Sequence, residues 1–274
     1  RQCRAGVGPP SPIEGHRRRR VPRQVGRPDG RTGAGRARIA PSSGPDRADL
    51  AGIADLEPLR ELEVNPPDLL DGFTRAVSIA VRLPVAVFEQ IKDRPTPLYA
   101  SVYQTANRIL DEIAFKTSVL IQNDGYLSLP VPASQVLDRK NWMGAISHKA
   151  VARMAGIGWQ GKNLLLITAK YGSRVRLVTV LTNAPLKVDC PVKNRCGECN
   201  MCRDACPVGA IKGVGTETYY RDREEALYLS RCADKLAGEF AAIPDVGVPV
   251  CGICIKVCPF GRRSGIRGQG SADN

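Results

Sequence analysis

The spacing of apolar and polar residues predicts that order begins near Asp49 and that strands and helices are mixed from there on. Residues 73–81 alternate in polarity and are rich in β-branched side chains, which is typical of a strand. A long amphipathic helix is expected to begin at Thr96-Pro97, where a hydroxyl N-cap precedes a proline in the first turn, and to end near Gln122. Shorter elements are expected as a helix at 84–92, an extended piece at 125–130, and helices at about 147–155 and 222–240.

Two further apolar runs, 164–168 and 174–181, flank Tyr171-Gly172 and predict an antiparallel hairpin. Helices and strands in this order indicate an α+β domain that ends near Pro185. Beyond that residue glycine, proline and cysteine dominate the sequence, so a second region with a different construction is expected there.

Composition adds two limits to this picture. Hydrophobic residues make up 43% of the 274 residues, which is enough for one large or two modest domains with an apolar core. The formal net charge is +13, but +8 of it lies in residues 1–50, so the remainder of the chain is only mildly basic. Net charge alone therefore does not indicate a nucleic-acid-binding protein.

Residues 1–48 are rich in Arg, Gly and Pro and show no hydrophobic period. Such a segment buries too little apolar surface to offset the entropy of ordering, so it is expected to be disordered. A basic arm that contacts RNA is one interpretation of this segment, and a passive tail is the other.

Cysteine is the residue type that indicates chemistry. Nine of the ten cysteines lie between 190 and 258, and the tenth is Cys3. No stretch resembles a signal peptide, and none approaches the roughly 20 apolar residues that a membrane span needs. Tight Cys-x2-Cys spacings in such a chain favour thiolates that hold metal in the cytoplasm over disulfides.

The spacing of the cysteines indicates two iron–sulfur clusters. Cys196 to Cys206 follow C-x2-C-x2-C-x3-C with a proline next, and a second run from Cys251 to Cys258 also ends in Cys-Pro. A short loop can bend three thiolates around one cluster, while the fourth cysteine turns away and binds a different cluster. Zinc is the alternative, but zinc ribbons use paired Cys-x2-Cys knuckles and lack these Cys-Pro endings.

Counting ligands assigns most of the cysteines. The first cluster takes Cys196, Cys199, Cys202 and Cys258, and the second takes Cys206, Cys251 and Cys254. The second cluster lacks one ligand, for which Cys232 is the first candidate, Cys190 the rival and Cys3 a distant third.

Residues 156–162 are the other distinctive segment, and they read GIGWQGK. The context contradicts a Rossmann or P-loop site, because the segment follows a helix and precedes a strand. A loop that holds a cofactor through Gly156, Gly158, Trp159, Gly161 and Lys162 is one interpretation, and a helix C-cap with a tight turn is the other.

Candidates for acid–base chemistry are few. His148 is the only histidine beyond residue 48 and would titrate near neutrality, and Asp138 lies ten residues before it. Both are proposed catalytic residues. Trp142, Trp159 and Tyr171 are possible pocket residues.

Taken in order, these residues resemble a known family. The segment 156–162, then Leu164-Leu-Ile, Tyr171-Gly-Ser, Leu181-Thr182, the Cys196 run with Cys-Pro-Val-Gly-Ala-Ile211, and the Cys251 run are similar to epoxyqueuosine reductases over roughly 145–262. A weaker likeness extends to about residue 70.

The resemblance implies a cobalamin-binding, nitroreductase-like α/β domain fused to a two-cluster bacterial ferredoxin-like domain. In that family the clusters feed electrons to cobalt, which reduces an epoxide on a tRNA base; corrinoid reductive dehalogenases are similar relatives. The chain is then expected to contain a disordered segment at 1–48, an α/β cofactor or substrate domain at 49–187, a double 4Fe–4S domain at 188–263 and a loose tail at 264–274.

The chain departs from the family at the catalytic acid, because the family's aspartate falls at or near Trp142 here. The main hypothesis is therefore a divergent iron–sulfur oxidoreductase with a corrinoid, served by an upstream ferredoxin or flavodoxin and acting on tRNA. An electron carrier whose first domain only docks a partner is the alternative, and an RNA-binding protein with structural clusters is a third.

Overall fold

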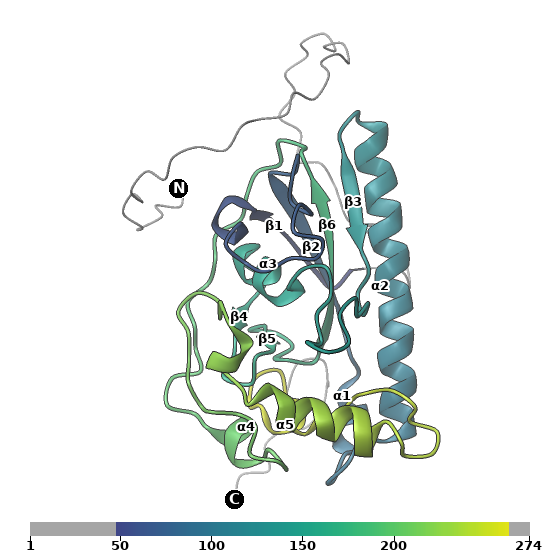
Figure 1. Ribbon diagram of the computed structural model, residues 1–274, viewed down its shortest axis with the longest axis vertical. Coiled ribbons are helices and arrows are strands. Elements are labelled where there is room, and N and C mark those ends of the chain that lie inside the picture. The colour runs from purple at the N-terminus through teal and green to yellow at the C-terminus, as the bar shows by residue number, and fades with distance from the viewer. Residues whose placement is uncertain (1–47, 263–274) are drawn as a thin grey trace, which may run out of the picture. The chain divides into compact units, whose positions relative to one another are not determined.

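The computed structural model describes residues 48–262, which belong to one compact unit (Figure 1). The segments predicted to be disordered or loose, and Cys3, lie outside the described residues apart from Ala48. The elements in chain order are β1 (Leu50–Asp55), η1 (Glu57–Leu59), β2 (Arg75–Arg82), α1 (Val85–Glu89), α2 (Pro97–Asn123), β3 (Ser128–Val131), α3 (His148–Met154), β4 (Trp159–Gln160), β5 (Leu166–Ile167), β6 (Val175–Thr182), α4 (Met201–Asp204), η2 (Arg223–Glu225), α5 (Leu229–Asp234), η3 (Lys235–Phe240) and α6 (Ile253–Val257).

A four-stranded sheet in the order β1-β2-β6-β3 forms the centre, and all its pairs are antiparallel. The predicted α+β class is therefore confirmed for the described residues. Both β2 and β6 lie inside the sheet, and their buried residues run almost without interruption. This is expected of strands that are covered on both faces.

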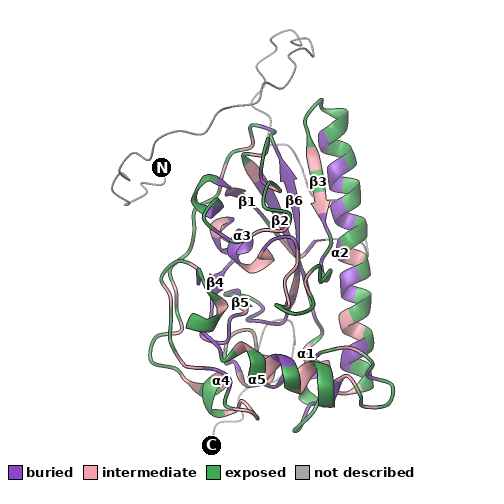
Figure 2. Ribbon diagram, viewed as in Figure 1, coloured by how far each residue is buried: buried purple, intermediate pink, exposed green. Residues whose placement is uncertain are grey.

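The two faces of the sheet are covered by different helices. Val77 and Ile79 of β2 pack in one apolar cluster with residues of α2, while Ala76 and Ala80 belong to clusters that contain residues of α3. Side chains of a strand alternate between faces, so the small residues of β2 all face α3. Figure 2 shows the buried stripe of α2 turned toward the sheet.

The locally encoded elements form where the sequence predicts them. Thr96 caps α2, since its hydroxyl accepts a hydrogen bond from the Tyr99 amide at 3.2 Å. Ser147 caps α3 in the same way through the Ala150 amide. The strand at 73–81 appears as β2, with bounds displaced by one or two residues.

The predicted hairpin at 164–168 and 174–181 is wrong. β5 pairs with β4 instead, and β6 pairs with β2 and β3, so only the isolated bridge Thr168↔Gly172 joins the two runs. The reason is that β6 is apolar on both faces and needs two neighbouring strands, which nearby segments of the chain do not supply.

The helix predicted at 222–240 is broken into η2, α5 and η3. Residues between the first two pieces bond elsewhere: the Lys212 amide donates to Ala226, the Tyr228 amide donates to Ala210, and Ile211 bridges Leu227. These pairings hold residues 210–212 beside 226–228 and end the helical pattern there.

One apolar cluster extends across the two regions that the sequence distinguishes. Val246, Val250 and Ile253 from the cysteine-rich region pack with Phe88, Tyr99 and other residues of the sheet side. The domain boundary near residue 187 therefore stays a prediction. No described helix is both long enough and apolar enough to cross a membrane.

Candidate functional site

Eight cysteines of the described residues carry free thiols, and the thiols that influence one another electrostatically divide into two groups of four. The first group is Cys196, Cys199, Cys202 and Cys258. Burial, and then the neighbouring thiolates of Cys196 and Cys258, raise the pKa of the Cys202 thiol to about 11. Burial also raises the pKa of the Cys258 thiol, and the neighbouring Cys196 thiolate acts in the same direction.

The second group is Cys206, Cys232, Cys251 and Cys254. Burial raises the pKa of Cys232, with the Cys206 thiolate as the next cause, and burial raises that of Cys251 to about 11. Burial raises the pKa of the Cys254 thiol, and the other three thiolates of its group raise it further. It also has Cys202 as a neighbour, so the two groups adjoin.

The donor chemistry of both groups fits iron–sulfur clusters. Each group offers four thiols whose deprotonated forms repel one another, a cost that bound iron removes. Backbone and side-chain N–H groups already point at the sulfurs: Trp159 Nε1 lies 3.4 Å from Cys196 Sγ, and the Ala210 amide lies 3.3 Å from Cys206 Sγ. Between residues 48 and 262 no three His, Cys, Asp or Glu side chains are gathered closely enough to hold a single metal ion.

Cys190 belongs to neither group. It is exposed, and its carbonyl lies against Gly156, where an added Cβ would come within 2.5 Å of the oxygen. Cys232, by contrast, is placed beside Cys206 and Cys251 by α5.

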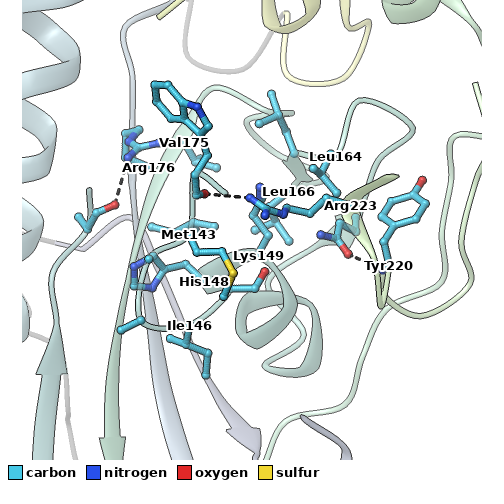
Figure 3. Close-up of a pocket in the computed structure, with 18 of the residues that line it drawn as sticks. Met143, Ile146, His148, Lys149, Leu164, Leu166, Val175, Arg176, Tyr220 and Arg223 are labelled. Carbon is cyan, nitrogen blue, oxygen red and sulfur yellow. Dashed lines mark hydrogen bonds between the residues drawn. The ribbon is translucent and has the colours of Figure 1, made fainter. Parts of the chain in front are cut away.

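A cavity of about 560 Å³ lies beside the thiol groups, and Figure 3 shows its lining. Its apolar wall comes from Leu164, Leu166, Val175, Leu177, Met143 and Ile146. Residues next to the cysteines also line it. Ile255 follows Cys254, and Ser173 is a neighbour of Cys258 that influences the pKa of its thiol. The volume is in the range of small-molecule sites.

His148 lies in the cavity wall, but both ring nitrogens are already bonded. Nε2 lies 3.0 Å from the Pro132 carbonyl oxygen, and Nδ1 lies 2.8 Å from Thr179 Oγ1. A carbonyl only accepts, so Nε2 carries the proton and Nδ1 accepts from the threonine hydroxyl. Burial lowers the pKa of His148 to about 4, so the ring is neutral near pH 7. It holds α3 to β6 and to the Pro132 segment.

Asp138 does not line the cavity. Its carboxylate accepts hydrogen bonds from the Lys140 and Asn141 amides and from the Asn141 side chain, and these bonds keep its pKa below the usual range. The backbone of Asp138 pairs with Met143, which does line the cavity. Asp138 thus lies in the loop that forms part of the cavity wall, but its side chain does not face the cavity.

Trp142 is a cavity residue and has a left-handed backbone with φ of 52°. That conformation is uncommon for a residue other than glycine. Its carbonyl accepts from Arg223 Nη1 at 2.8 Å, which holds this part of the loop to η2.

Within the 156–162 segment, Trp159 and Lys162 face the first thiol group instead of the cavity. Trp159 contacts Cys196, and Lys162 Nζ lies 3.2 Å from Asn200 Oδ1 in the loop between Cys199 and Cys202. The glycines serve packing: Gly156 ends α3 with φ of 69°, and a Cβ on Gly158 would lie 2.3 Å from the Ile167 carbonyl oxygen. The neighbour Gln160 does line the cavity.

The cavity cations Lys149, Arg176 and Arg223 were not predicted from the sequence, and neither was Arg221 beside them. The first three come from α3, β6 and η2 and meet only in the folded chain. No spacing along the sequence distinguishes them from surface charges. Tyr171, a predicted pocket residue, does not line this cavity.

Comparisons with known proteins add a family context to this geometry. The model of the 4Fe-4S double cluster binding domain matches residues 195–261, which include all eight free thiols. The chain is 40% identical over 119 residues to an epoxyqueuosine reductase of Listeria monocytogenes, covering 43% of this chain and 31% of that protein. It is 30% identical over 207 residues to the enzyme of the same name from Bacillus anthracis, covering 74% of this chain and 52% of that protein.

Solved structures agree with the sequence comparisons. A crystal structure of an epoxyqueuosine reductase superposes with a TM-score of 0.54 at 25% identity, over 80% of this chain and 64% of that one. Another, which contains an epoxyqueuosine-modified tRNA stem loop, has a TM-score of 0.50 at 26% identity over 80% and 63% of the two chains. A catabolic reductive dehalogenase shares the fold, with a TM-score of 0.61 at 23% identity over 79% of this chain and 30% of that one. The chain spans about half the length of the curated relative that it matches over 207 residues.

Proposed function

Because this chain belongs to the epoxyqueuosine reductase family, of whose curated members it spans about half or less, we propose that it is an iron–sulfur oxidoreductase that passes electrons through two 4Fe–4S clusters to a reduction in the cavity. Epoxyqueuosine in tRNA is the proposed substrate, which would place the protein in queuosine biosynthesis. The compartment that suits reduced thiolates and tRNA is the cytoplasm.

The proposed cluster ligands are the two groups of four thiols. Cys196, Cys199, Cys202 and Cys258 would hold the first cluster, and Cys206, Cys232, Cys251 and Cys254 the second. Their grouping in the fold supports this assignment, including Cys232 as the eighth ligand.

A single observation carries the proposal: the cavity borders both thiol groups. Ser173 of its wall is a neighbour of Cys258 in the first group, and Lys149 of its wall is an electrostatic neighbour of Cys232 in the second. A reducible molecule in the cavity would therefore sit beside the clusters with no intervening domain.

Cobalamin is the proposed cofactor, and when bound it would supply a metal centre that takes up these electrons and reduces the substrate. The apolar wall, with Leu166, Val175 and Leu177, suits the face of a flat macrocycle and would exclude water from it. Because the 156–162 segment resembles the family, Gly156 to Lys162 stay part of the proposed site. Their proposed contacts are with the first cluster, since Trp159 and Lys162 would fix the loop that holds it.

For the proton of the reduction we retain Asp138 as the proposed donor and assign His148 to positioning α3. Asp138 lies in the loop that forms the cavity wall, and its present hydrogen bonds lower its pKa, so the role of donor requires the loop to release the carboxylate and turn it inward. Asp138→Asn is expected to lower turnover by about a hundredfold or more, the lower end of general acid catalysis, without changing iron content. A variant with unchanged turnover would remove Asp138 from the mechanism.

The test begins with anaerobic preparation of the chain, followed by iron, sulfide and cobalt analysis. About eight irons and eight sulfides are expected from two cubes. Added cobalamin should bind and change its absorbance on reduction, and an epoxyqueuosine-containing stem loop should then be converted. Zinc without acid-labile sulfide would refute the cluster proposal.

Cysteine variants test the eighth ligand. Cys232→Ala should lose iron and the signal of the second cluster, while Cys190→Ala, which changes the rival candidate, should keep both. The reverse result would mean that Cys190, and not Cys232, is the eighth ligand.

An electron carrier with a docking domain is the second candidate. It is favoured by Trp142 at the position where the family has its acid. Eight irons, no cobalamin binding, and a stable complex with a ferredoxin or flavodoxin would decide for the carrier. The proposed oxidoreductase needs the same type of electron donor as a partner, but only transiently.

A further inference from the structure

The cavity wall carries more basic than acidic side chains, and neither of its carboxylates, Glu63 and Asp222, pairs with Lys149, Arg176 or Arg223. Lys149 has no hydrogen bond or ion pair in residues 48–262. Arg223 donates only to the carbonyls of Asn141 and Trp142, and Arg176 donates to the Asn107 side chain and the Ala133 carbonyl. Figure 3 shows Lys149 and Arg223 close together, with Arg176 on the side of His148.

The other charged groups of the wall are already engaged or lie at its edge. Asp222 caps η2 by accepting from the Glu224 amide at 2.9 Å, and Glu63 is exposed. Arg221 pairs with Glu61 at 2.9 Å. Within the wall, Lys149, Arg223 and Arg176 therefore have no carboxylate as an ion-pair partner, and the four basic side chains outnumber the two acidic ones.

Half-buried cations without an ion-pair partner are costly, and their mutual repulsion adds to the cost. The two arginines are close enough to influence Lys149: burial, and then the charges of Arg223 and Arg176, lower the pKa of Lys149 to about 8. An anion that entered the cavity would remove this cost. Arginine and lysine together are the usual pair for a phosphate, the arginine through its fork and the lysine as a point charge.

We infer that Lys149 and Arg223, with Arg176 opposite, bind a phosphate group of the ligand that occupies this cavity. The inference rests on the proposed function only in taking this cavity as the ligand site. The phosphate can belong to the nucleotide loop of a corrinoid or to the backbone of an RNA stem loop, and both are phosphodiesters.

Lys149→Gln provides the sharpest test, because Lys149 makes no bond whose loss would disturb the fold. The full chain with its clusters is dialysed to equilibrium against labelled inorganic phosphate. Removing a charge-assisted hydrogen bond is expected to weaken phosphate binding about tenfold or more. Lys92→Gln removes an exposed lysine outside the cavity and should bind phosphate as the unmodified chain does.

A second readout needs no variant. Acetylation of Lys149 by a lysine-reactive reagent, measured by mass spectrometry, should slow when phosphate is added, whereas acetylation of Lys92 should not. Unchanged acetylation of Lys149, or equal phosphate binding by the Lys149→Gln and Lys92→Gln chains, would overturn the inference.

Competition then identifies the source of the phosphate. Displacement of phosphate by cobalamin but not by cobinamide, which lacks the nucleotide phosphate, supports the corrinoid. Displacement by the RNA stem loop supports the RNA. Phosphate binding that neither ligand displaces would support the anion site and contradict the proposed function, so the two can fail separately.

Discussion

Trp159 connects the short β4–β5 hairpin to the first thiol group. The indole is buried, packs edge-on against Phe260 with ring centroids 4.9 Å apart, and directs Nε1 at Cys196 Sγ. Hydrogen bonds to cluster sulfurs influence reduction potential, because a donor stabilises the negative charge that reduction adds. The tryptophan therefore acts on the proposed first cluster and not on the cavity.

Trp159→Phe is expected to lower the reduction potential of the first cluster while retaining its iron, since the phenyl ring fills most of the space but donates no hydrogen bond. Potentiometric titration followed by electron paramagnetic resonance measures the change. Trp142→Phe is the matched control, because Trp142 lines the cavity instead. Equal potentials in the unmodified and Trp159→Phe chains would mean that the contact has no electronic effect.

His148 gives the fold a pH dependence of its own. Its pKa is lowered by burial from 6.5 to about 4, so the unfolded chain binds a proton between these values that the folded chain does not. Stability therefore decreases as pH falls through this window, by up to roughly 2 kcal/mol at pH 5.

His148→Gln should be less stable than the unmodified chain at pH 7, because the Thr179 contact is lost, but should lack this part of the pH dependence. Urea unfolding of both chains at pH 7 and pH 5 gives the comparison. A stability difference between the two chains that stays the same at both pH values would contradict the assigned protonation of the ring.

At the scale of elements, the β4–β5 hairpin depends on glycine. A Cβ on Gly158 would lie 2.3 Å from the Ile167 carbonyl oxygen and 2.9 Å from its carbon, both of which are backbone atoms that cannot rotate away. Gly158→Ala is expected to destabilise the protein by about 1–3 kcal/mol in urea unfolding. Gly238→Ala serves as the control, because nothing lies within 4 Å of its Cβ. Equal midpoints for the two variants would contradict the close approach.

The same hairpin shows where prediction from the sequence ends. The long helix α2, its cap at Thr96 and the helix α3 were predicted because their signals are local. The two-residue strand β4 was missed, since two residues show no period, and the partner of β6 was assigned wrongly, since β2 precedes it by about 100 residues. Pairing between distant segments depends on burial that appears only in the folded chain.

The candidate site divides in the same way. The spacing of the cysteines allowed the two thiol groups to be anticipated, and a ligand count led to Cys232. The cavity was not foreseen, because Lys149, Arg176 and Arg223 lie on three separate elements. The bonds that engage both nitrogens of His148 also come from distant residues, Pro132 and Thr179, which the sequence does not bring together.

At the scale of the whole molecule, the cysteine-rich region is joined to the sheet side through a buried contact as well as through the shared core. Arg174, at the start of β6, donates from Nη1 to the Phe260 carbonyl at 2.8 Å and from Nη2 to the Lys256 carbonyl at 3.1 Å. Nearby, Gly172 and Gly261 allow the backbones to meet, since a Cβ on Gly172 would lie 2.0 Å from Phe260 O. The last cysteine run is therefore held from outside its own region.

Arg174→Met should loosen that run and with it both clusters, because Cys258 belongs to the first thiol group while Cys251 and Cys254 belong to the second. The variant leaves two carbonyls without their donors, at a cost of about 1–3 kcal/mol for each buried group, so local opening should become at least about tenfold more frequent. The rate of iron transfer to a chelator under anaerobic conditions measures this opening. Arg94→Gln is the matched control, since Arg94 is exposed and bonds only to Asp93. If the Arg174→Met chain released iron no faster than the Arg94→Gln chain, the cysteine-rich region would hold its clusters without the sheet side, and the two regions would be independent in function as well as in sequence pattern.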